Sequence, residues 1–352
     1  MKAAHVPSQR PRDAKLLVVD SQGGLRHAPR AELAGFLQPG DVLVANDAAT
    51  LPASLSGLHA RTGQSIEVRL AGRRSLAVDD VREFTAIVFG AGDFHTRTED
   101  RALPPELRAG DVLRLGPLTA TVLRLLDHPR LIALRFEGVV DDIWAGIARH
   151  GKPIQYAHVG EPLALWDVWT RVAALPVAFE PPSAGFVIDW RLLSALKARG
   201  VVFATLTHAA GISSTGDEVL DRRLPLDEPY HLPAATVRAV TQARQRGGRV
   251  IALGTTVARA LEHAASRPGG LRAGEGLADQ RLGPQTQLRV VDGIVSGTHE
   301  PGTSHFELLR AFTSDAVLYR ATDALERQGY LTHEFGDSVL IEREPAKVAL
   351  AA

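Results

Sequence analysis

The sequence contains no cysteine among its 352 residues. This absence excludes disulfides, a thiolate nucleophile, a zinc site built on thiolates and a cysteine-bound iron–sulfur cluster. The chain also lacks an apolar run of transmembrane length, and residues 1–11 are polar and basic, unlike a signal peptide. We therefore expect a cytoplasmic protein that does not contact a membrane.

The chain also lacks an excess of either charge, because 40 basic residues balance 40 acidic ones. A dedicated nucleic-acid binder usually shows a basic excess or patch, so the composition gives no support for one. Hydrophobic residues make up 45% and charged residues 23% of the sequence, which is the balance of an ordinary globular protein. The length predicts two domains with sizeable cores, and we expect a monomer.

Two patterns alternate along the chain. Short apolar runs such as Glu83–Phe89 and Leu131–Phe136, separated by turn residues, predict strands throughout residues 65–140. Helical and strand patterns alternate on either side, which favours an α/β layer or barrel. The sequence therefore predicts a barrel-like α/β main domain from residues 1–64 and 141–352, interrupted by an inserted small all-β barrel.

The segment from Val250 to His263 predicts a strand, a tight turn and a helix. Val250–Leu253 is apolar, Gly254 begins the turn, and the apolar residues that follow keep helical spacing. This layout points free backbone N–H groups and two threonine hydroxyls at one place, where the helix dipole favours an anion. Arg259 and Glu262 share one face of the helix, and we expect Arg259 to face a ligand. A purely structural strand–turn–helix capped by threonine fits the same pattern.

Other polar residues follow predicted strands or precede helices. Asn46 and Asp47 end a strand, where α/β sheets gather ligands, although Asn–Asp is also a common turn pair. The small residues of Pro182–Gly185 allow close approach of the backbone to a ligand, although a plain loop would look the same. His208 follows a predicted strand, and an isolated histidine there also fits a structural role.

A pair of histidines lies late in the chain, where His299 and His305 flank Glu300. Two histidines and a glutamate suggest a metal site, but their spacing matches neither common zinc motif. We therefore predict no metal.

Several segments resemble the family of S-adenosylmethionine:tRNA ribosyltransferase-isomerases, which build epoxyqueuosine. Residues 254–262, GTTVARALE, are similar to that family's GTTVVRTLE, and residues 39–47, PGDVLVAND, are similar to its PGDLLVVND. Pro182–Gly185 stands where the family has PTAG, Val290–Asp292 where it has VVD, and Phe335–Asp337 begins a match to YGDAMLI. These matches are collinear and cover nearly the whole chain, so the resemblance implies the same fold.

The resemblance implies an enzyme that uses S-adenosylmethionine as ribosyl donor and a 7-aminomethyl-7-deazaguanine as acceptor, in tRNA or as a related small molecule. Adenine and methionine would be released. Such a reaction needs a general base, an acid near adenine and an anchor for the methionine carboxylate. By position, the candidate catalytic residues are His208, His299 and Asp47. The candidate substrate contacts are Asn46, Ser183, Ala184, Gly185, Gly254, Thr255, Thr256, Arg259, Glu262, Asp292 and Ser304.

The chain also departs from the family pattern at polar positions. Ala49 and Ser54 replace two arginines, and Val187 and Leu226 replace two histidines. The lost arginines and the neutral net charge predict weak binding to tRNA. A non-catalytic or repurposed relative that binds S-adenosylmethionine, a nucleoside or tRNA is therefore the alternative to an enzyme.

Overall fold

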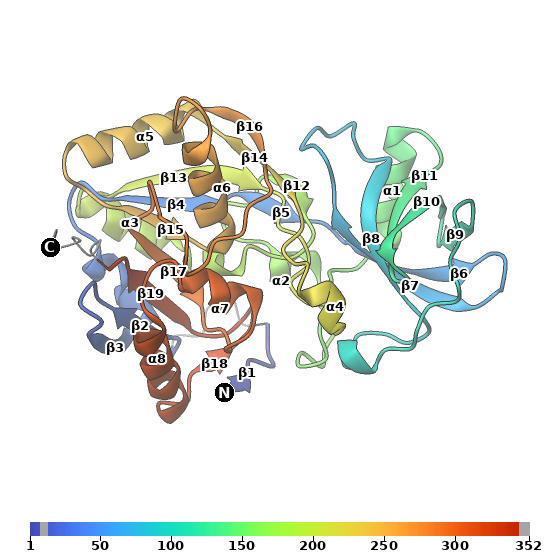
Figure 1. The fold of residues 1–352 in the computed structure, drawn as a ribbon, viewed down its shortest axis with the longest axis horizontal. Coiled ribbons are helices and arrows are strands. Elements are labelled where there is room, and N and C mark those ends of the chain that lie inside the picture. The colour runs from blue at the N-terminus through green and yellow to red at the C-terminus, as the bar shows by residue number, and fades with distance from the viewer. Residues whose placement is uncertain (8–12, 345–352) are drawn as a thin grey trace, which may run out of the picture.

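A computed structural model describes residues 1–7 and 13–344, which form two parts lying side by side (Figure 1). The larger part is built on a nine-stranded mixed sheet. Its strands, in spatial order, are β16 (Gly274–Ala278), β14 (Glu228–Leu232), β13 (Val202–His208), β4 (Val42–Asn46), β15 (Val250–Leu253), β17 (Gly293–Gly297), β19 (Ser338–Glu342), β2 (Lys15–Val19) and β3 (Leu25–Pro29). The central strands β13, β4, β15 and β17 run parallel to one another.

Helices cover both faces of this sheet, because its central strands are apolar on both sides. Val42 and Val44 of β4 belong to a core that includes residues of four helices, while Leu43 and Ala45 belong to a core on the opposite face. The helices of the first core are α5 (Ala234–Gln245), α6 (Thr255–Ser266), α7 (Ser304–Leu309) and α8 (Asp315–Arg327). The opposite core includes η1 (Arg30–Phe36) and α3 (Trp190–Ala198), whose N-cap Asp189 accepts a hydrogen bond from the backbone N–H of Leu192. Alternate strand residues therefore hold two helical layers.

The smaller part is a closed antiparallel barrel with its own apolar core. Its strands, in spatial order, are β10 (Leu118–His128), β11 (Leu131–Phe136), β8 (Glu83–Phe89), β7 (Ser65–Gly72), β6 (Ser54–His59) and β9 (Val112–Leu115). Closure pairs every strand on both sides and so removes exposed sheet edges. Among the described residues between β6 and β11, the helical structure is one short turn, η2 (Thr98–Asp100).

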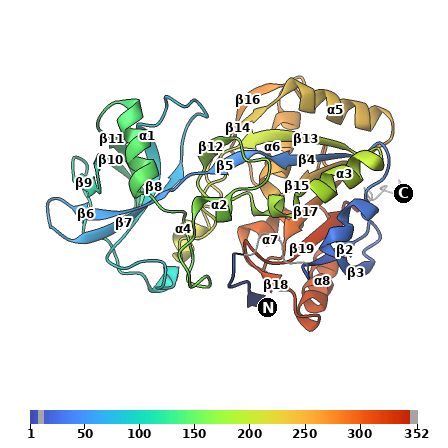
Figure 2. The same ribbon diagram turned by 180° about the vertical axis from the view of Figure 1, so that it is seen from behind.

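Short elements join the two parts (Figure 2). The chain leaves β4 through β5 (Ala48–Thr50), enters the barrel, and returns through α1 (Val140–His150) and α2 (Leu165–Val168) to β12 (Leu175–Ala178), which pairs with β5. The remaining elements are β1 (Lys2–Ala3), η3 (Ser183–Val187), α4 (Glu218–Asp221) and β18 (Leu331–Thr332). Within the described residues, no helix has both the length and the apolar character needed to span a bilayer.

The α/β class and the small all-β barrel are confirmed, and closure is confined to the small barrel because the larger sheet runs openly from β16 to β3. The first barrel strand begins at Ser54, ahead of the predicted boundary at residue 65. The alternating pattern of β6 is weak, since Ser54, Ser56 and Gly57 dilute its apolar residues. We keep the division into a discontinuous α/β domain and an inserted barrel as a proposal, with the insertion beginning near Ser54.

Candidate active site

A cavity of about 770 Å³ lies at the carboxyl ends of the parallel strands β13, β15 and β17. Its wall includes the predicted segments at Pro182–Ala184, Gly254–Thr256 and His299–Ser304, together with Gly211–Ser214 and Arg281–Thr286. The carboxyl edge is where parallel sheets place their ligands, because loops and helix starts converge there. The structure thus brings three segments that are far apart in the sequence, each carrying candidate substrate contacts, to one cavity.

The turn between β15 and α6 requires a glycine. Gly254 has a backbone φ of +102°, which side chains rarely allow, and its N–H donates to the carbonyl of Val295 at 2.8 Å. A Cβ at Gly254 would also come within 3.4 Å of the Ala184 side chain across the cavity wall. Helix α6 therefore starts at Thr255 with its amino end at the cavity, an arrangement that suits an anion.

Asn46 connects the strands behind the cavity. Its Oδ1 accepts hydrogen bonds from the backbone N–H groups of His208 and Ala48, both at 3.0 Å. Its Nδ2 donates to the carbonyl of His208 at 2.9 Å and to the Thr256 hydroxyl at 3.3 Å. Neighbouring Asp47 accepts a hydrogen bond of 2.7 Å from the Thr207 hydroxyl. Both residues thus fix β4, β13 and the start of α6, and they lie behind the lining residues.

His208 is fully buried behind the cavity, where its Nε2 lies 3.3 Å from Oε2 of Glu228. Glu228 itself lines the cavity, accepts the N–H of Gly211 at 2.6 Å, and pairs closely with Arg259. Burial lowers the pKa of His208 well below its usual value and raises that of Glu228, against the opposing effect of Arg259. His208 therefore lies behind the cavity lining, with Glu228 between it and the cavity.

Arg259 differs from the expectation of a ligand-facing arginine. Its guanidinium borders the cavity, but the residue is only 3% exposed. Besides Glu228, it donates to the carbonyl groups of Ala278 (2.8 Å), Leu226 (3.2 Å) and Gln280 (3.2 Å). These bonds connect α6 to the strands and loops beside it. Arg259 therefore has a structural role that the sequence pattern did not reveal.

Three other predicted contacts lie outside the cavity lining. Glu262 accepts hydrogen bonds from the backbone N–H groups of the segment 289–291, at 2.7 to 2.9 Å. Asp292 accepts the N–H of Val250, at the end of β15 opposite Gly254. Gly185 lies against Thr170, so that an added Cβ would come within 2.8 Å of the threonine methyl group.

Glu180 is a cavity residue that the sequence analysis missed. It is 7% exposed, and its Oε2 accepts the backbone N–H of Ser213 at 3.1 Å. The hydroxyl of Tyr156 donates to its Oε1 through a short hydrogen bond. Burial raises the pKa of Glu180 to about 7, so the group can exchange a proton at neutral pH. Residues 156, 180 and 213 lie in three separate connections, and no sequence spacing relates them.

His299 and His305 lie together at the cavity, with ring centroids 4.4 Å apart and planes at 12°. Burial lowers the pKa of both, so both imidazoles are neutral near pH 7. A neutral imidazole offers one N–H donor and one acceptor nitrogen. Ser304 begins α7, and its neighbour Thr303 caps that helix by accepting the N–H of Phe306 at 3.2 Å.

The cavity wall carries more acidic than basic side chains. Its carboxylates are Glu180, Glu218, Asp221, Glu228 and Glu307, and its arginines are Arg222, Arg259 and Arg281. The carboxylates of the wall offer places for cationic groups, while the amino end of α6 offers one place for an anionic group.

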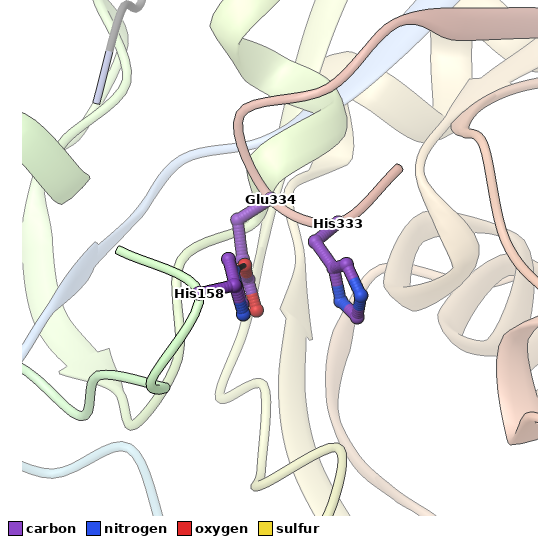
Figure 3. A group of neighbouring side chains, drawn as sticks. All are labelled: His158, His333 and Glu334. Carbon is purple, nitrogen blue, oxygen red and sulfur yellow. Dashed lines mark hydrogen bonds and ion pairs between the residues drawn. The ribbon is translucent and has the colours of Figure 1, made fainter. Parts of the chain in front are cut away.

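A third group of titratable side chains lies outside the cavity lining. His158, His333 and Glu334 each offer a potential metal-binding atom, and these atoms lie within 4.8 Å of one another (Figure 3). Among the described residues, this is the one group of three or more histidine, aspartate or glutamate side chains whose donor atoms lie this close together.

An open mixed sheet with a cavity at the carboxyl ends of its parallel strands defines an α/β protein with a candidate site for a small molecule. Among known proteins, the family described as queuosine biosynthesis protein matches residues 1–341. The chain belongs to that family. The predicted resemblance to an enzyme family is therefore confirmed.

Curated relatives carry the name S-adenosylmethionine:tRNA ribosyltransferase-isomerase. The protein of Pelobacter propionicus is 32% identical over 352 residues, covering 96% of both chains. That of Gloeobacter violaceus is 34% identical over 348 residues, covering 94% of this chain and 90% of the relative. A solved structure of an S-adenosylmethionine tRNA ribosyltransferase from Thermotoga maritima is 23% identical, with a TM-score of 0.49 and coverage of 97% of this chain and 95% of that one.

Proposed function

We propose that the cavity binds S-adenosylmethionine and that the protein transfers and isomerises its ribosyl part. The acceptor is the aminomethyl group of a 7-aminomethyl-7-deazaguanine, in tRNA or as a related small molecule, and adenine and methionine are released. The observation that carries this proposal is the convergence of Pro182–Ala184, Gly254–Thr256 and His299–Ser304 on one cavity.

The size and charge of the cavity support this ligand. Small-molecule pockets usually measure roughly 300–1,000 Å³, and the cavity of about 770 Å³ lies within that range. S-adenosylmethionine carries a positive sulfonium and a positive amino group, which suit the carboxylates of the wall. Its carboxylate suits the start of α6 at Thr255 and Thr256, where free backbone N–H groups and the helix dipole favour an anion.

Two cavity residues suit the proton transfers of this reaction. The sulfonium makes its neighbouring carbon acidic, and we assign Glu180 as the general base that removes the proton, because its pKa lies close to neutral pH. We assign the neutral imidazole of His299 as hydrogen-bonding partner of the departing adenine. His208 and Asp47 then act indirectly, through Glu228 and through the strand connection at Thr207.

The direct test measures adenine release from S-adenosylmethionine, once with undermodified tRNA and once with the free aminomethyl-deazaguanine base. We expect release with at least one acceptor and none without an acceptor. Glu83→Gln, which changes a partly exposed glutamate of the barrel, serves as a matched control for Glu180→Gln. Binding of S-adenosylmethionine without release with either acceptor would support the non-catalytic alternative. Absence of binding would contradict the proposal.

The same assay distinguishes the acceptors by salt. Net charge is zero, and Ala49 and Ser54 stand where two family arginines are expected. If tRNA is bound through phosphates, its affinity falls steeply as salt rises, whereas binding of the free base, which carries only its one ammonium charge, changes much less. We expect weak, salt-sensitive binding of tRNA. Tight binding that persists at high salt would contradict this expectation.

A further inference from the structure

Two distant segments bring three potential metal ligands together beside the cavity. His158 lies in the connection between α1 and α2, and His333 and Glu334 lie in the connection between β18 and β19. Figure 3 shows the three side chains gathered between these connections. Nε2 of His158 lies 3.1 Å from Oε2 of Glu334, and the two imidazole rings stack with centroids 4.4 Å apart.

We propose that His158, His333 and Glu334 form a divalent-metal site, with Zn²⁺ as the preferred ion. Two imidazole nitrogens and one carboxylate oxygen are a donor set that zinc accepts, with water in the fourth position. Metal–ligand bonds of about 2.0–2.2 Å place tetrahedral ligands roughly 3.4 Å apart. The 3.1 Å separation of His158 and Glu334 already meets this requirement. The donor atom of His333 lies within 4.8 Å of both others.

The backbone of each segment is held independently of an ion. His333 has a φ of +68°, a conformation that few residues other than glycine adopt. Its turn is fixed because the N–H of Gly336 donates to the carbonyl of His333 at 3.0 Å. On the other side, the N–H of Val159 donates to the carbonyl of Tyr156 at 3.1 Å, and the side chain of Gln155 donates to the carbonyl of Val159 at 2.8 Å. The donors are therefore presented by ordered turns, which lowers the entropic cost of binding an ion.

The ion would link the connection between α1 and α2, through which the chain returns from the barrel, to the connection between β18 and β19. The carbonyl of His333 and the ring of His299 both lie within 4 Å of the position that a Cβ on Gly297 would occupy. The site is thus behind the cavity wall at His299, while its own three ligands lie outside the lining. We assign the ion a structural role, and this inference does not depend on the proposed reaction.

No spacing rule could predict this site from the sequence. His158 and Glu334 are 176 residues apart, whereas the zinc motifs that sequences reveal place ligands a few residues apart. The pair considered in the sequence, His299 and His305, instead stacks at the cavity.

The test uses the full chain with its purification tag removed, stripped by a chelator and titrated with Co²⁺ and Zn²⁺. We expect one equivalent to bind, a Co²⁺ absorption spectrum of low coordination number, and a rise in melting temperature with Zn²⁺. His158→Ala and Glu334→Gln each lower affinity by about 100-fold or more, because even residues that only orient a ligand change it by about 10- to 100-fold. His231→Ala, at an exposed histidine of β14, is the matched control and leaves affinity unchanged.

Circular dichroism shows whether each variant is folded. If His158→Ala does not fold, the conservative Glu334→Gln still tests the proposal. Two results would overturn the proposal. One is binding in Glu334→Gln and His158→Ala that equals binding in His231→Ala, which would mean adventitious surface histidines. The other is loss of the bound ion in His305→Ala with retention in Glu334→Gln, which would place the ion at the cavity histidines.

Discussion

The barrel and the cavity wall each bury glutamates, but with different partners. Glu67 in the barrel accepts hydrogen bonds from Nε of Arg69 at 2.7 Å and from the Ser54 hydroxyl at 2.8 Å. It also forms a close ion pair with Arg101. Both guanidinium carbons also lie over the Phe89 ring, at 4.8 and 5.2 Å from its centroid. Burial alone would raise the pKa of Glu67, but the two arginines outweigh it and the pKa is lowered. Glu67 is therefore a fixed anion.

The glutamates of the cavity wall have fewer cationic partners. Glu228 pairs with one arginine, Arg259, and burial still raises its pKa. Glu180 is hydrogen-bonded by Tyr156 and Ser213, and its pKa rises to about 7. The comparison teaches that two guanidinium groups offset the desolvation of a buried carboxylate here, while one does not. A carboxyl without an arginine can carry a proton, and this molecule places one at its cavity.

The largest expected effect is on the chemistry. Glu180→Gln should lower kcat by about 10²- to 10⁴-fold, the usual contribution of a general base, with little change in the affinity for S-adenosylmethionine. A base works only when deprotonated, so the wild-type rate should rise with pH through about 7. That rise should disappear in the variant and persist in Glu83→Gln. An unchanged pH–rate profile in Glu180→Gln would refute the assignment.

The second prediction concerns the ion pairs of Glu67, the buried carboxylate of the barrel. Arg101→Met leaves Glu67 buried with one guanidinium, and removal of one partner from a buried ion pair costs about 3–5 kcal/mol. Arg135→Met, which breaks the exposed pair with Glu83 on the barrel surface, should cost about 0–1 kcal/mol. Urea denaturation measures both. Equal midpoints for the two variants would mean that the buried cluster contributes no more than a surface pair.

The third prediction concerns the opposite pH dependences of the two kinds of glutamate. Glu180, whose folded pKa is raised, contributes stability below its ordinary value near 4.5, and this stability is lost as pH rises to about 7. Each tenfold change in proton affinity is worth about 1.4 kcal/mol, so the loss approaches about 3 kcal/mol. Glu67, whose folded pKa is lowered, contributes stability above its ordinary value and loses it as pH falls.

Unfolding free energies of Glu180→Gln and Glu67→Gln, measured by urea denaturation between about pH 2.5 and 8 and compared with the wild type, test these signs. Relative to the wild type, Glu180→Gln should gain stability as pH rises from 4.5 to 7. The unfolding free energy of Glu67→Gln should lie below that of the wild type at neutral pH, and this difference should shrink as pH falls. Parallel pH profiles for the two variants would show that arginine number does not distinguish the sites.

Local patterns predicted the segments of the cavity but not the direction of its charged side chains. Val250–Leu253 and the turn at Gly254 are short-range features, since an apolar run, a glycine and helical spacing define them. Arg259 was expected to face a ligand because α6 appeared to have one apolar face. In the structure α6 is buried from Val257 to Glu262, because the edge strand β16 and the segment that follows it also pack against the helix. Arg259 bonds to the carbonyl groups of Ala278 and Gln280, and Glu262 accepts the N–H groups of residues 289–291. A helix covered on this many sides has no exposed face for a pattern to reveal.

Glu180 shows a second limit of the sequence. Burial raises its pKa, and the hydrogen bonds from Tyr156 and Ser213, which reach it from other connections of the chain, oppose the rise. Burial and pairing of a carboxyl arise only when distant segments pack together, so neither is encoded in local spacing. The same reasoning applies to His158 and Glu334.

The smallest expected effect tests whether the hydroxyl or the arginines keep Glu67 ionised. Ser54→Ala removes the hydrogen bond of 2.8 Å to Oε1 but leaves both guanidinium partners in place. We expect a loss of about 1 kcal/mol, the usual net contribution of one hydrogen bond. The loss of stability toward acid pH should be unchanged, because Arg69 and Arg101 still favour the ionised carboxylate. Disappearance of that acid-dependent loss in Ser54→Ala would assign the ionisation of Glu67 to the hydroxyl and so contradict the comparison.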